Sequence, residues 1–383
     1  MGEWGNGRTR ANPLQPPFAH SPIHPFTHSS FLTQPEEISY SVSPITWWGR
    51  FSRRSVNGLN KDSYIVGVDV GGTKIAAGLV NREAQVVART VLPTPGDDDV
   101  NIVLDQIYQS IDETLNKSSV DRRDIVGIGV VTPGPLDPQT GVLFHAPNIP
   151  ALKNVPILKL VQTRFGLPTV VDNDANAAGL AEALVGAGAG YRYVLYVTVS
   201  TGIGTGVVID QEIYHGRHGA AGEGGHVTID YNGPLCACGR RGCIEAYASG
   251  TALTRRTLER LKTTPAPSKI VELVAGDVSQ VTPVVVSQAA RQGDELALEL
   301  VHEIGKYLGI WLGGMINLLD PDIIIIGGGL SSIGDLLFTV IRETVPHYTL
   351  NPFVGNIRIV PAQLLNNVGI LGAAALHMRR KVK

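Results

Sequence analysis

Residues 64–80 read YIVGVDVGGTKIAAGLV: an apolar run with one acid, Asp69, then a glycine turn and a second apolar run. The same order recurs at residues 193–209, YVLYVTVSTGIGTGVVI, where another glycine turn joins two apolar runs. Short apolar runs bounded by turn residues are typical of buried strands. The recurrence predicts a weak internal duplication, with one strand–turn–strand copy in each of two domains.

The remaining chain alternates strands with helices, which predicts an α/β protein. The run VNIVLDQIYQSIDETLNK has apolar residues at helical spacing, and residues 124–134 read as a buried strand. A strand, an acidic turn and a helix follow at residues 167–188. After a mainly helical region, residues 322–337 give a strand, a triple-glycine turn and a helix, and the chain closes with a strand and a helix.

Composition is that of an ordinary globular enzyme. The chain has 383 residues, which suggests about two domains, and 43% hydrophobic residues, which is enough for substantial cores. The formal net charge of −2 gives no electrostatic footprint for nucleic acid. No apolar run approaches the roughly 20 residues that span a bilayer. We therefore expect neither a nucleic-acid nor a membrane partner.

Residues 1–61 differ from the rest, being rich in Pro, Ser, His and aromatic residues. Neither helical nor strand periodicity is sustained there, so this segment is predicted to be a disordered extension. It lacks the compact apolar region of a secretory signal, although its few acids and its arginines weakly resemble an organelle transit peptide. Translation from a misplaced start codon would look similar. We expect a cytoplasmic protein, with organelle targeting as the alternative.

All three cysteines of the chain lie within residues 223–245, EGGHVTIDYNGPLCACGRRGCIE. Three thiols cannot pair off as disulfides, whereas three thiolates and one imidazole complete a closed tetrahedral zinc shell. The four candidate ligands are His226, Cys236, Cys238 and Cys243. A closed shell has no open position for water, so the zinc would be structural and would brace the flanking Glu223 and Glu245. The plainer alternative is three buried thiols; either suits a reducing compartment.

The glycine turns do not match the common nucleotide-binding motifs. A Walker loop or a dinucleotide fingerprint places its glycines between a strand and a helix, whereas the first two turns here lead into strands. A glycine-tipped hairpin still brings several backbone N–H groups close to phosphate oxygens. Thr73, Lys74 and Thr201 would add donors. A single such turn is more often only a tight turn, but three occur at strand ends, at residues 71–73, 202–204 and 327–329.

An acidic turn, VVDNDANAA, places Asp172, Asn173 and Asp174 where an apolar strand ends and a helix begins. Asp and Asn are favoured there as helix caps, because their side chains accept hydrogen bonds from free N–H groups. A carboxylate at the carboxyl end of a strand is also where a general base would lie. The residues alone leave both interpretations open.

Taken together, five segments resemble the ROK family of sugar kinases and repressors. They are DVGGTK, PNIP, DNDANA, VSTGIGTGVVIDQEIYHGRHGAAGEGGH and CACGRRGCIEAYASG, and the resemblance runs from about residue 64 to the end. It implies an α/β, two-domain, actin-like or hexokinase-type ATPase of ribonuclease-H-like topology with an interdomain cleft. It also implies a smaller domain of residues 62–174 plus 367–383, and a larger domain of residues 175–366 with the zinc-binding segment 226–243.

The resemblance further implies roles for individual residues. Asp174 matches the catalytic base. The sugar ligands match Asn148, Asn173, Asp174, Glu223, His226 and Glu245. The zinc ligands match His226, Cys236, Cys238 and Cys243. The phosphate and adenosine segments match Asp69, Gly71, Gly72, Thr73, Lys74, Thr201, Gly202, Gly204, Gly328 and Gly329. One departure is visible: the Gly-Trp pair that usually follows PNIP is replaced by Ala151 and Leu152.

The implied activity is ATP-dependent phosphorylation of the 6-hydroxyl of glucose, with Mg²⁺ on the phosphates and Asp174 as the base. Kinases of N-acetylmannosamine, N-acetylglucosamine or another hexose are the alternatives. A sugar-responsive repressor is a further alternative, but residues 1–61 lack the compact amphipathic helices and basic face of a DNA-binding module. Homodimers or tetramers are usual in the family, and we expect one here.

Overall fold

The first sheet has the order β3-β2-β1-β4-β8. A computed structural model describes residues 63–96, 99–263 and 267–379, so the predicted extension over residues 1–61 lies outside the described residues. The strands are β1 (Tyr64–Val70), β2 (Lys74–Val80), β3 (Val86–Pro93), β4 (Ile125–Thr132) and β8 (Thr169–Asn173). The first three form an antiparallel meander, and β4 and β8 extend it in parallel with β1.

The second sheet, of order β11-β10-β9-β12-β13, repeats the arrangement of the first. Its strands are β9 (Tyr193–Val199), β10 (Ile203–Ile209), β11 (Glu212–Ile213), β12 (Ile323–Gly327) and β13 (Arg358–Pro361). Again the first three are antiparallel, while β12 and β13 run parallel to β9. The duplicated strand–turn–strand units of the sequence therefore begin two sheets of the same topology, as the α/β ribonuclease-H-like prediction requires.

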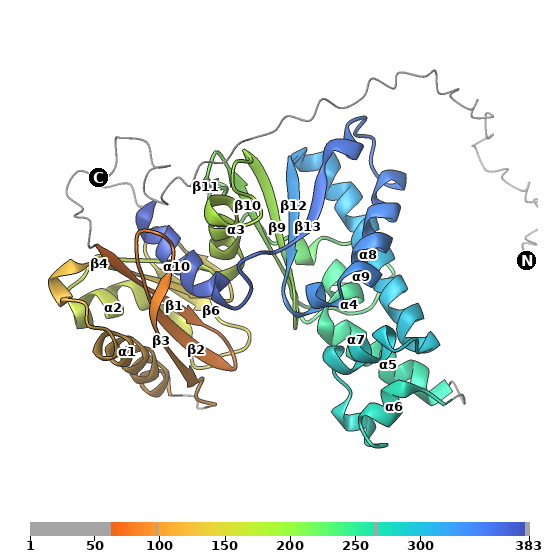
Figure 1. Cartoon of the computed structure of the whole chain (residues 1–383), viewed down its shortest axis with the longest axis horizontal. Coiled ribbons are helices and arrows are strands. Elements are labelled where there is room, and N and C mark those ends of the chain that lie inside the picture. The colour runs from red at the N-terminus through yellow and green to blue at the C-terminus, as the bar shows by residue number, and fades with distance from the viewer. Residues whose placement is uncertain (1–62, 97–98, 264–266, 380–383) are drawn as a thin grey trace, which may run out of the picture. The chain divides into compact units, whose positions relative to one another are not determined.

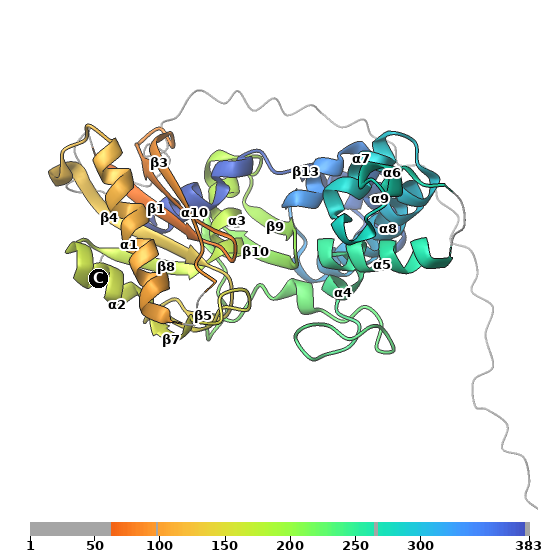
Figure 2. The same cartoon turned by 90° about the horizontal axis from the view of Figure 1, so that it is seen from below.

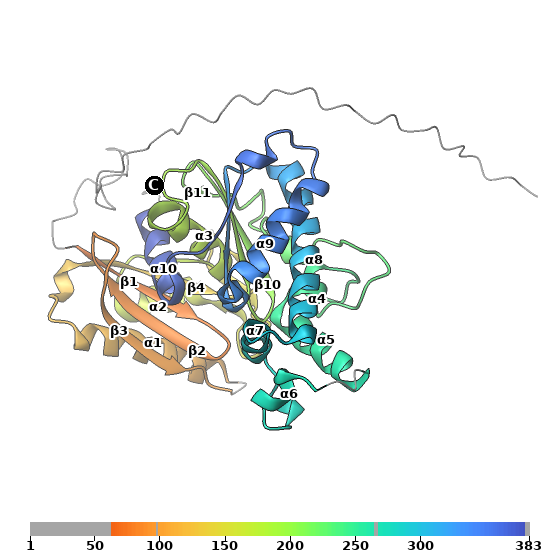
Figure 3. The same ribbon diagram turned by 45° about the vertical axis from the view of Figure 1, so that its right-hand side comes forward.

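Helices cover these sheets. On the first sheet, α1 (Val100–Lys117) packs on β2 and β3 (Figure 2), and α2 (Ile157–Phe165) packs on β8. Near the second sheet, α8 (Glu295–Leu319) lies beside α9 (Asp335–Thr344), as Figure 3 shows. The helices that precede α8 in the chain are α4 (Ile244–Ala248), α5 (Gly250–Thr263), α6 (Lys269–Leu273) and α7 (Pro283–Arg291). Each helix buries one apolar face in the core beneath it.

A third apolar cluster joins α3 (Asp174–Val185) to α10 (Val368–Met378), the last helix of the chain. Helix α10 returns to pack on β1 and β4 (Figure 1), and α3 also contacts β9 and β10 of the second sheet. The approach of α10 is very close: a Cβ on Gly129 of β4 would lie 1.7 Å from the carbonyl oxygen of Ala373. Glycine is required there because any side chain would collide with helix backbone.

The buried Glu182 of α3 joins two separate segments of the chain. Its carboxylate accepts the backbone N–H of Ala187, which follows α3, and those of Gln363 and Leu364, which precede α10. Burial raises the pKa of Glu182, while the three backbone donors lower it. The division into residues 62–174 plus 367–383 and residues 175–366 stays a prediction.

One element was not predicted. The region between β4 and α2 contains a three-stranded sheet of β5 (Leu136–Asp137), β6 (Val142–His145) and β7 (Lys153–Pro156). Strands of two to four residues are too short to show an alternating pattern. Among the helices of the described ranges, none is both long enough and apolar enough to cross a membrane.

Candidate active site

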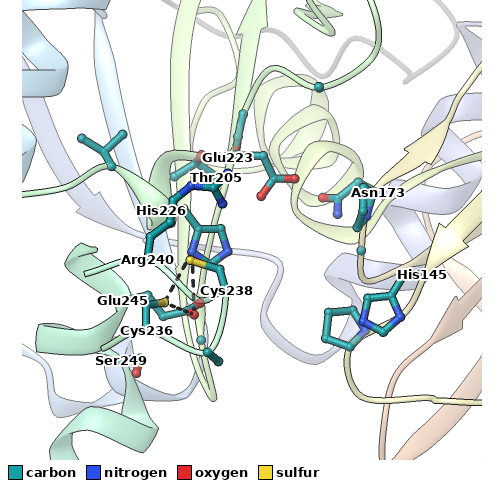
Figure 4. A pocket seen from close by; sticks show the side chains of 18 of the residues that line it. His145, Asn173, Thr205, Glu223, His226, Cys236, Cys238, Arg240, Glu245 and Ser249 are labelled. Carbon is teal, nitrogen blue, oxygen red and sulfur yellow. Dashed lines mark hydrogen bonds and ion pairs between the residues drawn. The ribbon is translucent and has the colours of Figure 1, made fainter. Parts of the chain in front are cut away.

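A cavity of about 1010 Å³, here called the site cavity, collects predicted site residues from four separate segments of the chain. Among the residues lining it are Asn148, Asn173, Thr201, Gly202, Glu223, His226, Cys236, Cys238 and Glu245. Figure 4 shows the Asn173 amide and the Glu223 carboxylate pointing toward each other, with His226 and Glu245 further along the same wall. Amides and carboxylates gathered in one cavity are suited to binding a polyhydroxylated ligand.

The four predicted zinc ligands form one cluster. Their donor atoms all lie within 4.8 Å of one another. The Sγ atoms of Cys238 and Cys243 are 3.7 Å apart, and the Cys236 Sγ lies 3.7 Å from His226 Nδ1. A tetrahedral zinc with Zn–S bonds of ~2.3 Å and Zn–N bonds of ~2.0 Å places such pairs of atoms roughly 3.5–3.8 Å apart. The spacing therefore fits a zinc shell with Nδ1 as the histidine ligand.

Local backbone geometry explains this cluster. Gly239 and Gly242 adopt positive φ values of 83° and 74°, and the turn that contains Gly239 is closed by a hydrogen bond from its N–H to Cys236 O. A Cβ on Gly242 would lie 1.6 Å from the Asp230 carbonyl oxygen. Glycine is thus required at these turns, which fold the segment so that distant sulfurs converge.

Glu245 links the cysteine cluster to the second glycine turn. Its Oε2 accepts the backbone N–H of Ile203 at 2.9 Å, and its Oε1 lies 4.0 Å from His226 Nδ1. Gly202 is necessary for this contact, because a Cβ there would lie 2.4 Å from Glu245 Oε2. The carboxylate is thereby held between the predicted metal site and the predicted phosphate-binding turn.

The loop that carries Glu223 is attached to β10 by Thr205, which sequence reasoning missed. The Thr205 hydroxyl donates to Gly222 O and accepts the Gly224 N–H at 3.0 Å. Thr205 is buried and lines the site cavity. Nothing in its sequence context separates it from an ordinary strand threonine, since its partners are 17 and 19 residues away.

At the start of α3, the structure gives the consecutive residues Asn173 and Asp174 different surroundings. Asn173 is the N-cap, and its Oδ1 accepts the N–H groups of Ala175 at 2.9 Å and Asn176 at 3.3 Å. Asp174, the first helical residue, is partly buried and is not among the residues that line the site cavity. Burial raises the pKa of Asp174, and the negative charge of Glu223 raises it further. Asp174 therefore lies within electrostatic range of the sugar-binding candidates.

The first glycine turn approaches the same region from β1 and β2. A Cβ on Gly72 would lie 2.6 Å from Asn148 Cβ, so the turn packs directly on this predicted sugar ligand. The Gly71 N–H donates to Lys74 O, and the Thr94 N–H donates to Thr73 O. Burial and the nearby Asp174 raise the pKa of Asp69 to about 6. The carboxylates of Asp69, in β1, and Asp174, at the start of α3, are thus close enough to repel each other.

The remaining predicted glycines have different surroundings. Gly328 adopts a φ of 81° against the carbonyl of Val199, and a Cβ on Gly329 would meet nothing within 4 Å. Gly204 is packed between Ala175 and Thr198, where a Cβ would lie 3.0 Å from each side chain. Gly329 is therefore the open position of the three, whereas Gly204 allows β10 to approach the first turn of α3.

Two cationic side chains of the site cavity were also missed. Arg240 lies between the second and third cysteines, and Arg255 belongs to α5. Figure 4 shows Arg240 beside His226. Arg255 donates to Ala246 O at 2.8 Å and pairs with Glu259. An arginine beside a cysteine motif has no distinctive spacing, so only the folded structure assigns it to the cavity.

Comparisons with known proteins agree with this geometry. The ROK family profile matches residues 65–380. The chain is 37% identical over 316 residues to a glucokinase of Thermotoga maritima, covering 82% of this chain and 98% of that protein. It is 30% identical over 319 residues to a xylose repressor of Caldicellulosiruptor bescii, covering 83% and 79% respectively.

A solved structure gives the same result. A ROK family glucokinase from Streptomyces griseus, in complex with glucose and AMPPNP, superposes with a TM-score of 0.73 at 35% identity, covering 82% of this chain and 99% of that one. The family profile, the sequence relatives and the solved structure all identify the same family. The chain belongs to the ROK family, and its fold is the two-domain, hexokinase-type ATPase fold.

Proposed function

We propose that the protein is an ATP-dependent hexokinase that phosphorylates the 6-hydroxyl of glucose, with Asp174 as the general base. The observation that carries the proposal is the convergence of Asn148, Asn173, Glu223, His226 and Glu245 on the site cavity. Asp174 follows Asn173 directly in α3 and couples electrostatically to Glu223. The 37% identity to a glucokinase over nearly its whole length supports the same activity.

The proposed sugar ligands suit the ring hydroxyls of a hexose. Carboxylates accept hydrogen bonds from hydroxyl groups, and amides both donate and accept them. When bound, the zinc would hold His226 by one ring nitrogen, leaving its other edge toward the sugar. The Ile203 N–H holds Glu245 in place, and Thr205 holds the Glu223 loop. The wall that faces the sugar would therefore be rigid before the sugar binds.

Asp174 has the properties of a base for alcohol phosphorylation. Its raised pKa makes the ionised carboxylate a stronger proton acceptor than an exposed aspartate. As the 6-oxygen attacks the γ-phosphorus of ATP, its proton passes to the Asp174 carboxylate, and ADP leaves with the electron pair of the broken P–O bond. General-base contributions of this kind are typically about 10²–10⁴-fold.

The phosphate side is proposed to be built from the three glycine turns and the strand ends beside them. It comprises Asp69, Gly71, Gly72, Thr73, Lys74, Thr201, Gly202 and Gly204 for the phosphates, and Gly328 and Gly329 for the adenosine. Mg²⁺ bound to ATP would neutralise phosphate charge, and Asp69 would be the carboxylate that faces it. Closure over both substrates would exclude water and limit wasteful hydrolysis of ATP.

A repressor is the second candidate, since the family relatives include a xylose repressor. The sugar-side residues alone suit either class, whereas Asp174 and the glycine turns favour a kinase. Kinases of N-acetylmannosamine, N-acetylglucosamine or another hexose are variants of the first proposal. A cytoplasmic location, a homodimer or tetramer, and the absence of a nucleic-acid partner stay predictions.

The test is a coupled ADP-release assay of the full-length protein across glucose, mannose, fructose, allose and the two N-acetylated hexosamines. We expect glucose to give the highest kcat/KM, with the 6-phosphate as product by NMR. Asp174→Asn should abolish most turnover while calorimetry still detects glucose binding. Preference for an acetylated sugar would overturn the choice of glucose, and near-normal turnover of Asp174→Asn would overturn the choice of base.

A further inference from the structure

Asp172, at the end of β8, has a side chain that is only 6% exposed, and its carboxylate contacts three hydrogen-bonding groups. Its Oδ1 accepts the Asn173 N–H at 2.7 Å and the Asn176 side-chain amide at 3.2 Å. Its Oδ2 lies 2.6 Å from His215 Nε2. A buried carboxylate is tolerated only when such donors surround it, because removing one leaves an uncompensated polar group.

These partners come from two separate parts of the chain. Asn173 is the N-cap of α3, and Asn176 lies in the first turn of this helix, which also carries Asp174. His215 follows β11 and opens the loop that leads to Glu223, and its carbonyl accepts the Ala221 N–H at 3.1 Å. Asp172 is therefore the point at which the helix with the proposed base meets the loop with a proposed sugar ligand.

The hydrogen-bond donors around Asp172 fix the orientation of the Asn176 amide and the protonated nitrogen of the His215 ring. Asn176 is buried, and its Oδ1 has no hydrogen-bond partner among the described residues. The orientation of this side-chain amide is therefore set by the hydrogen bond that its nitrogen donates to the Asp172 carboxylate. The hydrogen bond to Asp172 raises the pKa of His215, as expected for an imidazole that donates Nε2–H to a carboxylate.

We propose that Asp172 and His215 act as a positioning pair, which holds the first turn of α3 and the loop at residues 214–226 in the relative position that catalysis requires. Neither residue touches the substrate in this role. The proposal rests on the proposed kinase function, because the relative position of the helix and the loop matters only if Asp174 and Glu223 act on one sugar. A misplacement of about 1 Å in such a site can cost roughly 10²-fold in rate.

The test compares two replacements of similar size. His215→Gln keeps an N–H donor that reaches about as far as Nε2, whereas His215→Met fills a similar volume without any donor. In the full-length protein, assayed well below the melting temperature, we expect kcat/KM of His215→Met to fall by about 10²-fold. His215→Gln should stay close to wild type. His302→Met, on the exposed face of α8, is the matched control and should change nothing.

A second readout does not depend on the reaction. Hydrogen exchange of the amides of residues 173–176 should accelerate in His215→Met and stay slow in His215→Gln. Equal activity of both variants and wild type would overturn the proposal, as would equal loss in both or unchanged exchange in His215→Met. If the wild-type protein phosphorylates no hexose, the proposed function fails, and the exchange contrast alone still decides whether the pair positions α3.

Discussion

Gly225 offers the sharpest test of how the sugar-side wall is built. It lies between Glu223 and His226, and a Cβ at this position would be 1.9 Å from the carbonyl oxygen of Ile203 in β10. Real Cβ atoms essentially never come closer than 3.0 Å to a neighbour, so Gly225→Ala must separate the two segments by at least 1.1 Å. Both sides of the contact are backbone, so no side-chain rotation relieves it.

The expected consequence is a loss of catalysis greater than the loss of stability. A shift of this size moves Glu223 and His226 away from Asn173 and Glu245, so kcat/KM for glucose should fall by roughly 10²-fold. Overpacking of this kind typically costs about 1–3 kcal/mol of folding free energy, which lowers the melting temperature without unfolding the protein. A coupled ADP-release assay and differential scanning calorimetry measure the two effects separately.

Gly355→Ala is the matched control, because a Cβ there would meet nothing within 4 Å and the residue lies outside the site. It should leave both kcat/KM and the melting temperature unchanged. Should Gly225→Ala bind and turn over glucose as the wild type does, Glu223 and His226 would not need their observed positions, and the rigid-wall reasoning would be refuted.

Three further predictions follow from the structure. First, because burial and the nearby Asp174 raise the pKa of Asp69 to about 6, kcat/KM should fall as the pH drops through about 6, when the Asp69 carboxylate gains a proton; a pH–rate profile that declines only near ~4, the ordinary carboxylate range, would contradict this. Second, Cys243→Ala should remove stoichiometric zinc, as measured by elemental analysis, and lower the melting temperature; full zinc content in this variant would exclude the assigned ligand set. Third, Gly129→Ala should destabilise the protein by ~3 kcal/mol or more by pushing α10 off β4, whereas Gly314→Ala, which meets nothing within 4 Å, should not, as denaturant titrations would show.

Much of the architecture was predictable because it depends on local pattern. The apolar runs at residues 64–80 and 193–209 form β1–β2 and β9–β10, and the helix pattern after β3 forms α1. The cluster of His226 and the three cysteines, which could hold a metal ion, was predictable for a similar reason, since residue type and short spacing indicate it. The short strands β5 to β7 escaped prediction because two to four residues carry no periodicity.

The acidic turn shows that a local sequence pattern cannot assign a role to each of its residues. Asp172, Asn173 and Asp174 are equivalent candidates in the sequence, and each suits a helix cap or a base. Folding assigns them different surroundings: Asn173 caps α3, Asp172 is buried against His215, and Asp174 lies within electrostatic range of Asp69 and Glu223. Asp172 and Asp174 owe these surroundings to partners 43 to 105 residues away, which no local window includes, whereas Asn173 caps its own helix.

The amino-acid sequence alone determined the strand–turn–strand repeat, the family and the four candidate metal ligands, because each depends on residue type at short spacing. Only the tertiary structure decided which polar groups face one another: Glu245 on Ile203, Thr205 on the Glu223 loop, and Asp172 on His215. The physical reason is that hydrogen bonds and packing contacts are made between surfaces brought together by chain reversal, and their geometry exists only after the cores have formed.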